Sequence, residues 1–294
     1  MATTAPLKNR LQKLKKEYDL RKKGKDSLLV LIDEAEIPES VYNSNAIENS
    51  TLTLKETEKI LLEMEVSRQV SLREVYEAKN LARVMSYVRN KIIEKELDKE
   101  MLLLLHQMLI GGIDDRIAGR FRGKNEYVRV GTHIAPPPEH VERMIEAIFD
   151  NYSSDLNSFF SDKIAQFHLE FETVHPFNDG NGRIGRVIIN YQLQRLGFPV
   201  IIIRDKEKME YYRSFGEYRY DKKAKIMEKI IALALIESLH KRVAYLKGET
   251  IIPLIEYARK HRQSGPAVLN AAKRQNIPAF REKGVWKIGA TFND

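Results

Sequence analysis

Hydrophobic residues recur every three or four positions along most of the chain, and this period predicts α-helices with one apolar face. Thr53-Leu-Lys-Glu56 has capping-box spacing, so a helix is expected to begin there. Pro38 follows an apolar run, and a new helical segment is expected to start at it. The other ranges with helical spacing are 5–24, 71–91, 98–110, 139–151, 158–173, 182–196 and 222–247. The pattern predicts a mainly α fold, and the basic helix over 5–24 is expected to dock weakly or fray.

Two segments depart from the helical period. Residues 118–138 alternate polar and apolar positions among glycines and end in three prolines, which predicts a short β-hairpin leading into a loop. Residues 250–294 show two short helical patterns and then two short strands joined at Glu282-Lys283-Gly284. This order of elements is typical of a small winged helix-turn-helix module.

Composition and charge narrow the class of protein. The 294 residues include no cysteine, which excludes disulfide frameworks, thiolate metal sites and thiol nucleophiles. The chain has no apolar run long enough for a membrane helix and no apolar signal core at its N-terminus, so we expect a cytoplasmic protein without a membrane partner. Of the net charge of +8, most lies at the ends: residues 1–25 carry nine Lys or Arg against two acids, and residues 250–294 carry eight against three. Such ends can bind nucleic acid or an acidic partner, or can simply be solvated helix faces.

The segment HPFNDGNGRIGR, at residues 175–186, carries the candidate chemistry. Gly180 and Gly182 allow a loop with positive φ and unobstructed backbone N–H groups. The helix expected directly after this loop would present those groups to an anion. Arg183 and Arg186 lie three residues apart on one face of that helix, and guanidinium groups match phosphate oxygens.

Two further side chains in this segment suit phosphoryl transfer. Asp179 is a carboxylate suited to holding Mg²⁺ beside phosphates. His175 is the one side chain of the segment that can accept a proton near neutral pH. Each feature alone is more often structural, but together they indicate a site for a nucleotide's phosphates. The sequence has neither a Walker loop nor HExxH.

The segment resembles the defining motif of the Fic family, His-Pro-Phe-x-Asp-Gly-Asn-Gly-Arg-x-x-Arg, at every fixed position. Residues 118–122, 130–141, 165–177 and 209–215 are also similar to stretches of that family. The similarity extends over residues 26–245. It implies a Fic-type helical bundle with a small β-hairpin flap.

The resemblance implies a protein adenylyltransferase, a transferase that moves AMP from Mg²⁺-ATP to a Tyr, Thr or Ser hydroxyl of a target protein and releases pyrophosphate. In that role His175 would be the catalytic base and Asp179 the Mg²⁺ ligand. The residues expected around the phosphates are Gly180, Asn181 and Gly182, whose backbone would form the anion hole, with Arg183 and Arg186 on the β- and γ-phosphates.

The resemblance also places the flap at Val130, Gly131, Thr132 and His133, next to the bound nucleotide. An extended segment of the target can add to such a hairpin as a strand, which aligns its hydroxyl without strong demands on its sequence. His133 is equally compatible with a role in the flap and with a purely structural role, whereas His168 is expected to be a core histidine.

Ser44-x-x-x-Glu48-Asn49 matches the [Ser/Thr]-x-x-x-Glu-[Gly/Asn] inhibitory pattern of the family and lies N-terminal to the core. Ser44 and Glu48 share a helix face at i, i+4 spacing, within an inhibitory helix expected at about residues 42–50. Glu48 would pair with Arg186 and occupy the site of the γ-phosphate. The alternative is an ordinary exposed glutamate.

Two positions leave the activity partly open. Tyr211 corresponds to a residue that lines the adenine pocket, but Arg219 stands where many members have Asn. Transfer of another nucleotide therefore stays open, as does removal of AMP, because the inhibitory glutamate positions a water in some relatives. A third alternative is a DNA-binding regulator whose Fic core senses a nucleotide.

We expect three parts: an N-terminal helical region over 1–95, a Fic catalytic core over 96–248 and a winged helix-turn-helix over 249–294. The last part resembles the excisionase or MerR-like winged helix. DNA is its expected partner through residues 250–294, and a protein partner is an equal alternative. Its second helix offers the polar residues Asn270, Lys273, Arg274 and Gln275. A homodimer also remains open.

Overall fold

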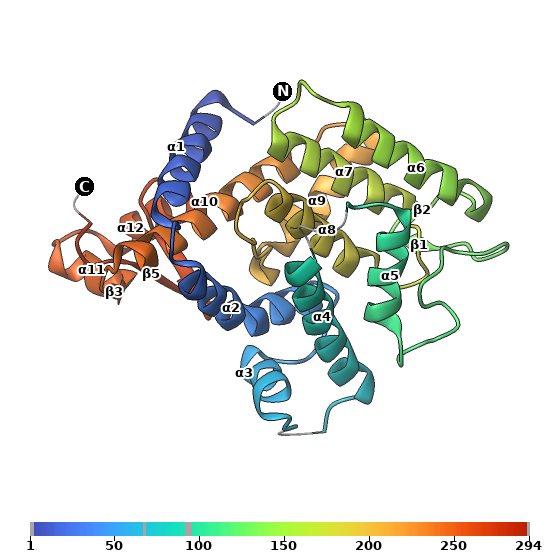
Figure 1. Cartoon of the computed structure of the whole chain (residues 1–294), viewed down its shortest axis with the longest axis horizontal. Coiled ribbons are helices and arrows are strands. Elements are labelled where there is room, and N and C mark those ends of the chain that lie inside the picture. The colour runs from blue at the N-terminus through green and yellow to red at the C-terminus, as the bar shows by residue number, and fades with distance from the viewer. Residues whose placement is uncertain (1–2, 67–68, 92–95, 293–294) are drawn as a thin grey trace. The chain divides into compact units, whose positions relative to one another are not determined.

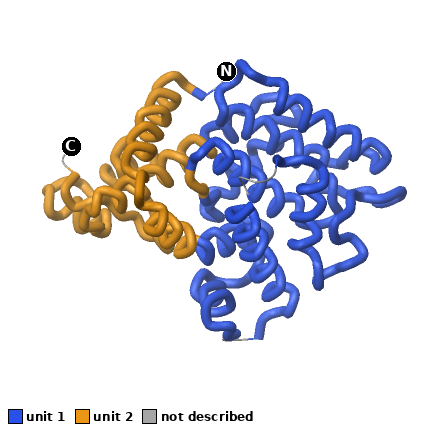
Figure 2. Tube along the Cα trace, viewed as in Figure 1, with its two compact units in different colours: residues 1–3, 37–198, 202–230 blue, residues 4–36, 199–201, 231–294 orange. Residues whose placement is uncertain are grey.

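The computed structural model describes residues 3–66, 69–91 and 96–292. It divides into two compact units (Figure 2). Unit 1 comprises residues 1–3, 37–198 and 202–230, and unit 2 comprises residues 4–36, 199–201 and 231–294. The three-part division expected from the sequence has other bounds and remains a prediction; residues 92–95, at the end of its first part, lie outside the described residues.

The fold is mainly α, as expected (Figure 1). In chain order the helices are α1 (Ala5–Arg21), α2 (Asp26–Ile47), α3 (Leu54–Glu58), the π-helix η1 (Lys59–Glu63), α4 (Leu72–Lys91), α5 (Lys99–Ile110), α6 (Pro138–Ser154), α7 (Phe160–Val174), α8 (Asn181–Arg195), the 3₁₀-helix η2 (Asp205–Glu207), α9 (Lys208–Asp221), α10 (Lys225–Lys247), α11 (Leu254–Lys260) and α12 (Gly265–Lys273). The strands are β1 (Arg129–Val130), β2 (His133–Ile134), β3 (Ile251–Pro253), β4 (Phe280–Glu282) and β5 (Val285–Gly289).

Unit 1 is a helical bundle in which α7 and α8 are the central elements. α7 packs against α6, α8 and α9, and α8 also packs against α4 and α5. The inward face of α7 carries Ile164, Phe167, Phe171 and Val174, all buried, at the spacing of one helix face. Residues of the candidate motif therefore start a helix that is enclosed by the bundle.

The helix starts follow local capping rules. Thr53 and Glu56 form the expected capping box at α3, with the Glu56 N–H donating to Thr53 Oγ1. Asp98 caps α5 by accepting from the Met101 N–H at 2.7 Å. The helix expected to begin at Thr53 is present as α3 and continues directly as the π-helix η1.

The structure corrects the expectation of a new helix at Pro38, because α2 runs through this proline without a break. Side chains on both sides of Pro38 are anchored within their own units. In unit 2, Arg242 donates to Glu36 at 2.6 Å, and in unit 1, Arg204 donates to Glu39 at 2.5 Å. A proline inside a helix costs about 3 kcal/mol, and α2 nevertheless stays helical between these two anchored side chains.

α9 was missed by the helical pattern. Its sequence contains Gly216 and several tyrosines, which weaken a prediction from periodicity alone. Packing of Tyr211, Phe215 and Tyr218 against α7 holds this segment in the helical conformation.

Unit 2 contains α1, β3, α11, α12, β4 and β5 together with parts of α2 and α10. The two expected strands are β4 and β5, and the turn between them has positive φ at Lys283 and Gly284, as a two-residue hairpin turn requires. β3 adds a third strand, giving the order β3-β5-β4. The assignment of this module to the winged-helix class remains a prediction.

The basic helix expected over 5–24 is α1, and its Leu11 and Tyr18 are buried. One expectation about unit 2 is wrong. Gln275 is not presented to a partner: it is 2% exposed and accepts a hydrogen bond from His240 Nδ1 at 2.9 Å. The backbone turns at Gln275 with φ 54°, and this turn directs the side chain into the unit.

Candidate active site

His175 is the residue that directly follows α7, and its backbone is left-handed, with φ 49° and ψ 64°. Such a conformation is uncommon for a residue with a Cβ and persists only where its surroundings hold it. Arg122 supplies that support, since its Nε donates to the His175 carbonyl at 2.8 Å and its backbone N–H donates to the Pro176 carbonyl at 2.9 Å. The remaining Arg122 donors reach the carbonyls of Glu126, Pro136 and Val174.

The buried side chains of Asn181 and His106 stabilise the loop between His175 and α8. The Asn181 side chain accepts from the Phe177 N–H and donates to the Phe177 carbonyl, at 2.9 and 2.8 Å. His106 stacks on Phe177 with ring centroids 3.7 Å apart and donates from Nε2 to the Asp179 carbonyl at 3.0 Å. Because the Gly119 N–H donates to His106 Nδ1, His106 is neutral in this arrangement. Burial lowers the pKa of His106 to about 4.

The start of α8 has the geometry of an anion site. Gly180 precedes the helix with φ 81°, a conformation that favours glycine. The first backbone N–H groups of a helix have no partner within it and attract negative charge. The Glu48 carboxylate lies here: a Cβ placed on Gly182 would be 2.2 Å from Glu48 Oε1. A carboxylate of the chain itself thus lies against the backbone expected to receive phosphate oxygens.

Arg186 binds the end of α2. Its Nη2 donates to Glu48 Oε1 at 2.9 Å and to the Ser44 carbonyl at 2.8 Å, and its Nε donates to Ser44 Oγ at 3.0 Å. Nη1 donates to the Tyr211 hydroxyl at 3.2 Å. Although burial lowers the pKa of Arg186, Tyr211 and Glu48 outweigh burial and raise it. The expected pairing of Glu48 with Arg186 is therefore present, and Asn49 follows with φ 67°, ending α2 as a left-handed cap.

Arg183 faces a different set of partners from Arg186. Its Nη2 donates to Asp179 Oδ1 at 2.9 Å, and its Nη1 lies 3.1 Å from Glu77 Oε1. Arg73 on α4 bonds both Glu77 and Asp179 Oδ2, which closes a ring of alternating charges. The two arginines expected to share the phosphates are thus separately engaged in this structure.

Asp179 fits the way proteins hold Mg²⁺, which often takes one carboxylate together with substrate phosphates. Its side chain is 32% exposed beside the first turn of α8. Burial raises the pKa of Asp179, but Arg183 and Arg73 more than offset this, so the carboxylate is ionised at neutral pH. No cluster of three or more His, Asp or Glu suited to a metal occurs among the described residues.

The flap is a tight hairpin in which Arg129 pairs with Ile134 and Val130 with His133. Gly131 has φ 59° at the turn, and Thr132 is exposed. His133 Nε2 donates to the Thr173 carbonyl of α7 at 2.9 Å, which ties the flap to the helix that ends at His175. Burial lowers the pKa of His133, and the charges of Arg219 and His175 add to this effect.

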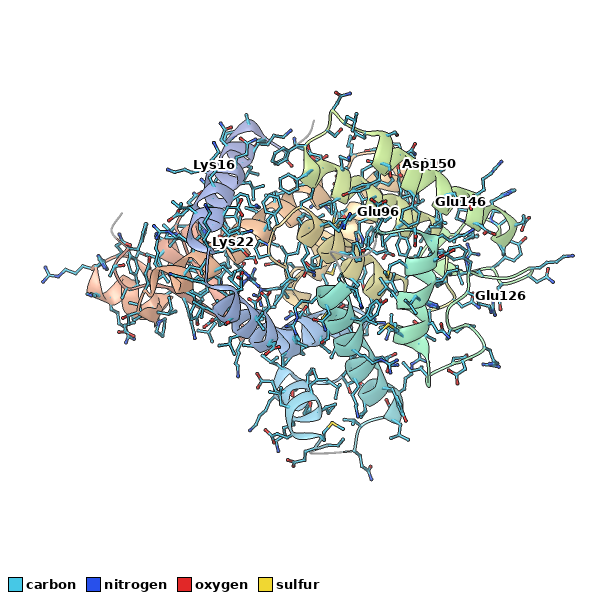
Figure 3. All side chains as sticks on the ribbon, in the orientation of Figure 1. Lys16, Lys22, Glu96, Glu126, Glu146 and Asp150 are labelled. Carbon is cyan, nitrogen blue, oxygen red and sulfur yellow. The ribbon has the colours of Figure 1, made fainter. Side chains whose placement is uncertain are left out.

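The loop before the flap is stabilised by an ion pair. Arg120 binds Glu126 through two parallel hydrogen bonds of 2.7 and 2.8 Å, and Arg120 lowers the pKa of Glu126 to about 2. Glu126 is labelled in Figure 3.

Tyr211 is 1% exposed, and its hydroxyl is hydrogen-bonded to His168 Nε2 at 2.8 Å. Its expected place in an adenine pocket remains a prediction, since its ring is enclosed here. Arg219 is half-buried, and burial lowers its pKa while Glu172 raises it. His168 is a buried core histidine, as expected.

Sequence reasoning missed several residues that shape the site: Arg73, Glu77, His106, Arg122 and Glu172. Arg122 and Glu172 lie inside stretches already noted as family-like, but charge alone does not distinguish them from surface residues. Arg73 and His106 are far from the motif in sequence, and no local pattern marks them.

Residues 96–193 match the family model described as the Fic/DOC family. That range contains the whole segment 175–186 and the flap. The similarity of residues 175–186 to the Fic motif is therefore matched by agreement over a much longer stretch. The family match ends before α9, so it carries no information on Tyr211 or Arg219.

Curated relatives extend the comparison. The chain is 30% identical over 218 residues to the protein adenylyltransferase Fic of Nematostella vectensis, covering 73% of this chain and 50% of the relative. It is 34% identical over 179 residues to the protein adenylyltransferase fic-1 of Caenorhabditis elegans, covering 59% of this chain and 35% of the relative. The chain thus spans half or less of the length of these relatives.

Solved structures agree in fold. A Fic domain containing signaling protein from Bacteroides thetaiotaomicron superimposes with a TM-score of 0.73 at 23% identity, covering 82% of this chain and 98% of that one. Fic-1 from Caenorhabditis elegans gives a TM-score of 0.72 at 26% identity, covering 83% and 74%. A Fic family protein from Desulfovibrio desulfuricans covers 100% of this chain and 98% of its own, with a TM-score of 0.66 at 19% identity. Among the described residues, no helix is both long and apolar enough to cross a membrane.

Proposed function

We propose that this protein is a self-inhibited adenylyltransferase. A Tyr, Thr or Ser hydroxyl of a target protein attacks the α-phosphorus of ATP, and the bond from that phosphorus to the bridging oxygen breaks. AMP becomes attached to the hydroxyl oxygen, and pyrophosphate leaves. His175 takes the hydroxyl proton as general base. The curated relatives that carry the name adenylyltransferase support this assignment.

The observation that carries the proposal is the anion that already lies at the start of α8. Glu48 Oε1 lies against Gly182 and accepts from Arg186 at 2.9 Å. Glu48 Oε1 stands in for a phosphate oxygen, because backbone N–H groups at a helix start and a guanidinium bind carboxylates and phosphates alike. Donors fixed before substrate arrives stabilise charge that develops on the α-phosphoryl oxygens.

Asp179 would hold Mg²⁺, which when bound would neutralise charge on the phosphates. For this the carboxylate must exchange its contact with Arg73 for the metal. Arg73 is 55% exposed and can move away at little cost, whereas Arg183 is 4% exposed and stays beside the phosphates. The roles of Gly180, Asn181, Arg183 and Arg186 are those that the resemblance to the Fic motif implies, and the positions of these residues around the loop support them.

The pairing of Glu48 with Arg186 acts as a brake in this proposal. Arg186 cannot bind the γ-phosphate while Glu48 and Ser44 occupy its donors. ATP is then excluded or held in a pose in which its α-phosphorus does not meet the target hydroxyl. Release of Glu48 is required for full activity.

The test is transfer of labelled nucleotide by the full chain carrying Glu48→Gly. We expect auto-modification to rise at least tenfold over the parent, because Arg186 and the start of α8 lose the carboxylate that lies in the place of the phosphate. Asn49→Gly is a matched control: a glycine suits the left-handed backbone there, and the Glu48–Arg186 contact remains. His175→Ala added to Glu48→Gly should abolish the signal. Unchanged labelling in a folded Glu48→Gly protein would contradict the brake, and absence of labelling in every variant would contradict the activity.

The same assay decides the nucleotide and the direction of the reaction. ATP, GTP, CTP and UTP are compared, with mass spectrometry of the modified residue. Arg219 is a half-buried cation near the site and stands where many family members have Asn. Preference for a nucleotide other than ATP would therefore change the nucleotide that we propose is transferred. Loss of AMP from pre-modified protein in the parent, but not in Glu48→Gly, would assign removal of AMP as a second activity.

A second candidate function, DNA binding by residues 250–294, is favoured by unpaired positive charge. Arg259, Lys260, Arg262, Lys273 and Arg274 are all exposed, and none has an acidic partner among the residues that the structure describes. Cations of this kind at the ends of α11 and α12 suit phosphate contacts. A protein partner is the alternative occupant.

Duplex binding measured by fluorescence anisotropy at several salt concentrations tests this function. Lys273→Ala with Arg274→Ala should weaken binding and reduce the slope of log affinity against log salt by about 2. Arg213→Ala with Lys223→Ala, both exposed on unit 1, is the control. Absence of binding at low salt would favour a protein partner.

A further inference from the structure

Glu172 is a buried carboxylate beside the candidate base. It lies on α7 three residues before His175, and its Oε2 is 3.6 Å from His175 Nδ1. Its side chain is 8% exposed, and Oε1 has no hydrogen-bond partner among the described residues. A charged group held this far from water requires a compensating partner.

The titratable and charged groups around Glu172 and His175 come from four elements. His168 lies on α7 itself, Arg186 on α8, and Tyr211 and Arg219 on α9. His133, in the flap, interacts electrostatically with His175. Burial by itself raises the pKa of Glu172. Contact with His175 and electrostatic interactions with His168 and Arg186 outweigh burial, so the pKa lies below its ordinary value. Glu172 is therefore a carboxylate at neutral pH.

Nδ1 is the nitrogen of the His175 ring that faces Glu172. Nδ1 is buried and has no hydrogen-bond partner among the described residues, and Glu172 Oε2 lies 3.6 Å from it, while the side chain as a whole is 16% exposed. Nε2 is then the nitrogen left to accept a proton from a target hydroxyl. Catalytic hydrogen bonds are often long in the free enzyme and tighten when substrate binds.

We propose that Glu172 is a positioning residue that holds His175 with its proton on Nδ1, so that Nε2 is the base. The proposal rests on the proposed function of His175. When the 3.6 Å contact shortens on substrate binding, the Nδ1–H donates to Glu172, which fixes the ring's tautomer and orientation. When Nε2 takes the proton of the hydroxyl, the same carboxylate stabilises the imidazolium that forms. The arrangement works like the carboxylate of a Ser-His-Asp triad, which orients the base and does not itself take the proton.

The alternative is that Glu172 only fills the space beside His168 and Gly185. A Cβ on Gly185 would lie 3.0 Å from Glu172 Oε1, so the carboxylate does pack tightly there. A packing role predicts loss of stability on substitution, with no change in the protonation of His175. A packing role and a positioning role of Glu172 therefore differ in whether substitution of Glu172 changes the protonation of His175.

The experiment uses the full chain with Glu48→Gly, to which Glu172→Gln is added. The steady-state rate with ATP should fall about 100-fold in kcat, with KM for ATP within twofold. The acidic limb of the pH–rate profile should move to lower pH, because the imidazolium loses its negative neighbour. Glu170→Gln is the matched control on the same helix, since Glu170 binds Gln166 and Tyr218 instead. This control should leave kcat and the profile unchanged.

A second readout does not depend on activity. The ¹⁵N shifts of His175, assigned by difference from His175→Ala, report which ring nitrogen carries the proton. We expect Nδ1–H in the Glu48→Gly parent and a shift toward Nε2–H with Glu172→Gln. If the parent transfers no nucleotide, the proposed function fails while this readout still decides the role of Glu172.

An unchanged tautomer and an unchanged acidic limb in folded Glu172→Gln would overturn the proposal. If Glu172→Gln does not fold, Glu172→Asp is used, which keeps the charge but shortens the side chain by one methylene. It should lower kcat about tenfold and leave the acidic limb near that of the parent. Parental kcat in Glu172→Asp would then overturn the proposal.

Discussion

At the residue scale, Gly185 decides how closely α8 can approach α7. A Cβ at this position would lie 2.6 Å from His168 Cε1 and 2.8 Å from His168 Nδ1. The His168 ring is 1% exposed and hydrogen-bonded to Tyr211, so it has no room to withdraw. Because Gly185 has no side chain, α8 can lie this close to α7, and this distance places the start of α8 relative to His175.

We expect Gly185→Ala to destabilise the protein by about 1–3 kcal/mol, because the added methyl overpacks a buried site. Thermal unfolding followed by circular dichroism measures the change. Gly216→Ala, inside α9 with nothing within 4 Å of its added Cβ, is the control and should stabilise by about 0.5–1 kcal/mol. Equal melting temperatures for the two variants would show that the approach at Gly185 is not tight.

At the element scale, Arg122 joins the loop before the flap to the end of α7. One guanidinium donates to four carbonyls, on Glu126, Pro136, Val174 and His175. Arg122 is 3% exposed, and its hydrogen bonds to these carbonyls are buried or part-buried. The left-handed turn at His175 depends on this contact.

Arg122→Lys keeps the charge but cannot reach four acceptors, since an ammonium lacks the planar fork of a guanidinium. We expect a loss of about 2–4 kcal/mol in stability, from buried carbonyls left without donors. In the Glu48→Gly background we also expect kcat to fall at least tenfold. Arg116→Lys, at a side chain that is 87% exposed, is the control and should change neither quantity. Full activity in Arg122→Lys would show that the His175 turn holds without it.

At the scale of the whole molecule, buried neutral histidines make stability depend on pH. Burial lowers the pKa of each of three histidines to about 4: His106, His168 and His240. In the unfolded chain a histidine takes up its proton near pH 6.5. The unfolded state therefore binds more protons between these values. The stabilisation is complete above about pH 6.5 and is lost as the pH falls toward 4.

Urea unfolding between pH 7 and pH 4.5 measures this dependence. We expect His240→Gln to make the slope of stability against pH shallower by up to about 1.4 kcal/mol per pH unit, which corresponds to one proton. His140→Gln, at an exposed position, is the matched control. A parental slope in His240→Gln would contradict the assignment of a neutral buried His240.

Most helices of this protein follow from local sequence. Residues 71–91 and 98–110 were predicted from apolar spacing and appear as α4 and α5. The capping box at Thr53 and the hairpin turn at Lys283-Gly284 were also predicted, because caps and tight turns depend on a few adjacent residues. The continuation of α2 through Pro38 and the helix α9 were not predicted correctly, because contacts with residues distant in the sequence stabilise both.

The sequence itself determines that the candidate groups of residues 175–186 lie together, because twelve adjacent residues carry a histidine, a carboxylate and a glycine loop before a helix. The pairing of Glu48 with Arg186 could be proposed from a pattern, but only the fold brings residues 138 positions apart to 2.9 Å. Arg122, His106 and Glu172 take their places around His175 only in the tertiary structure. Their partners are backbone carbonyls or groups in other turns of the chain, and such contacts leave no pattern in the sequence.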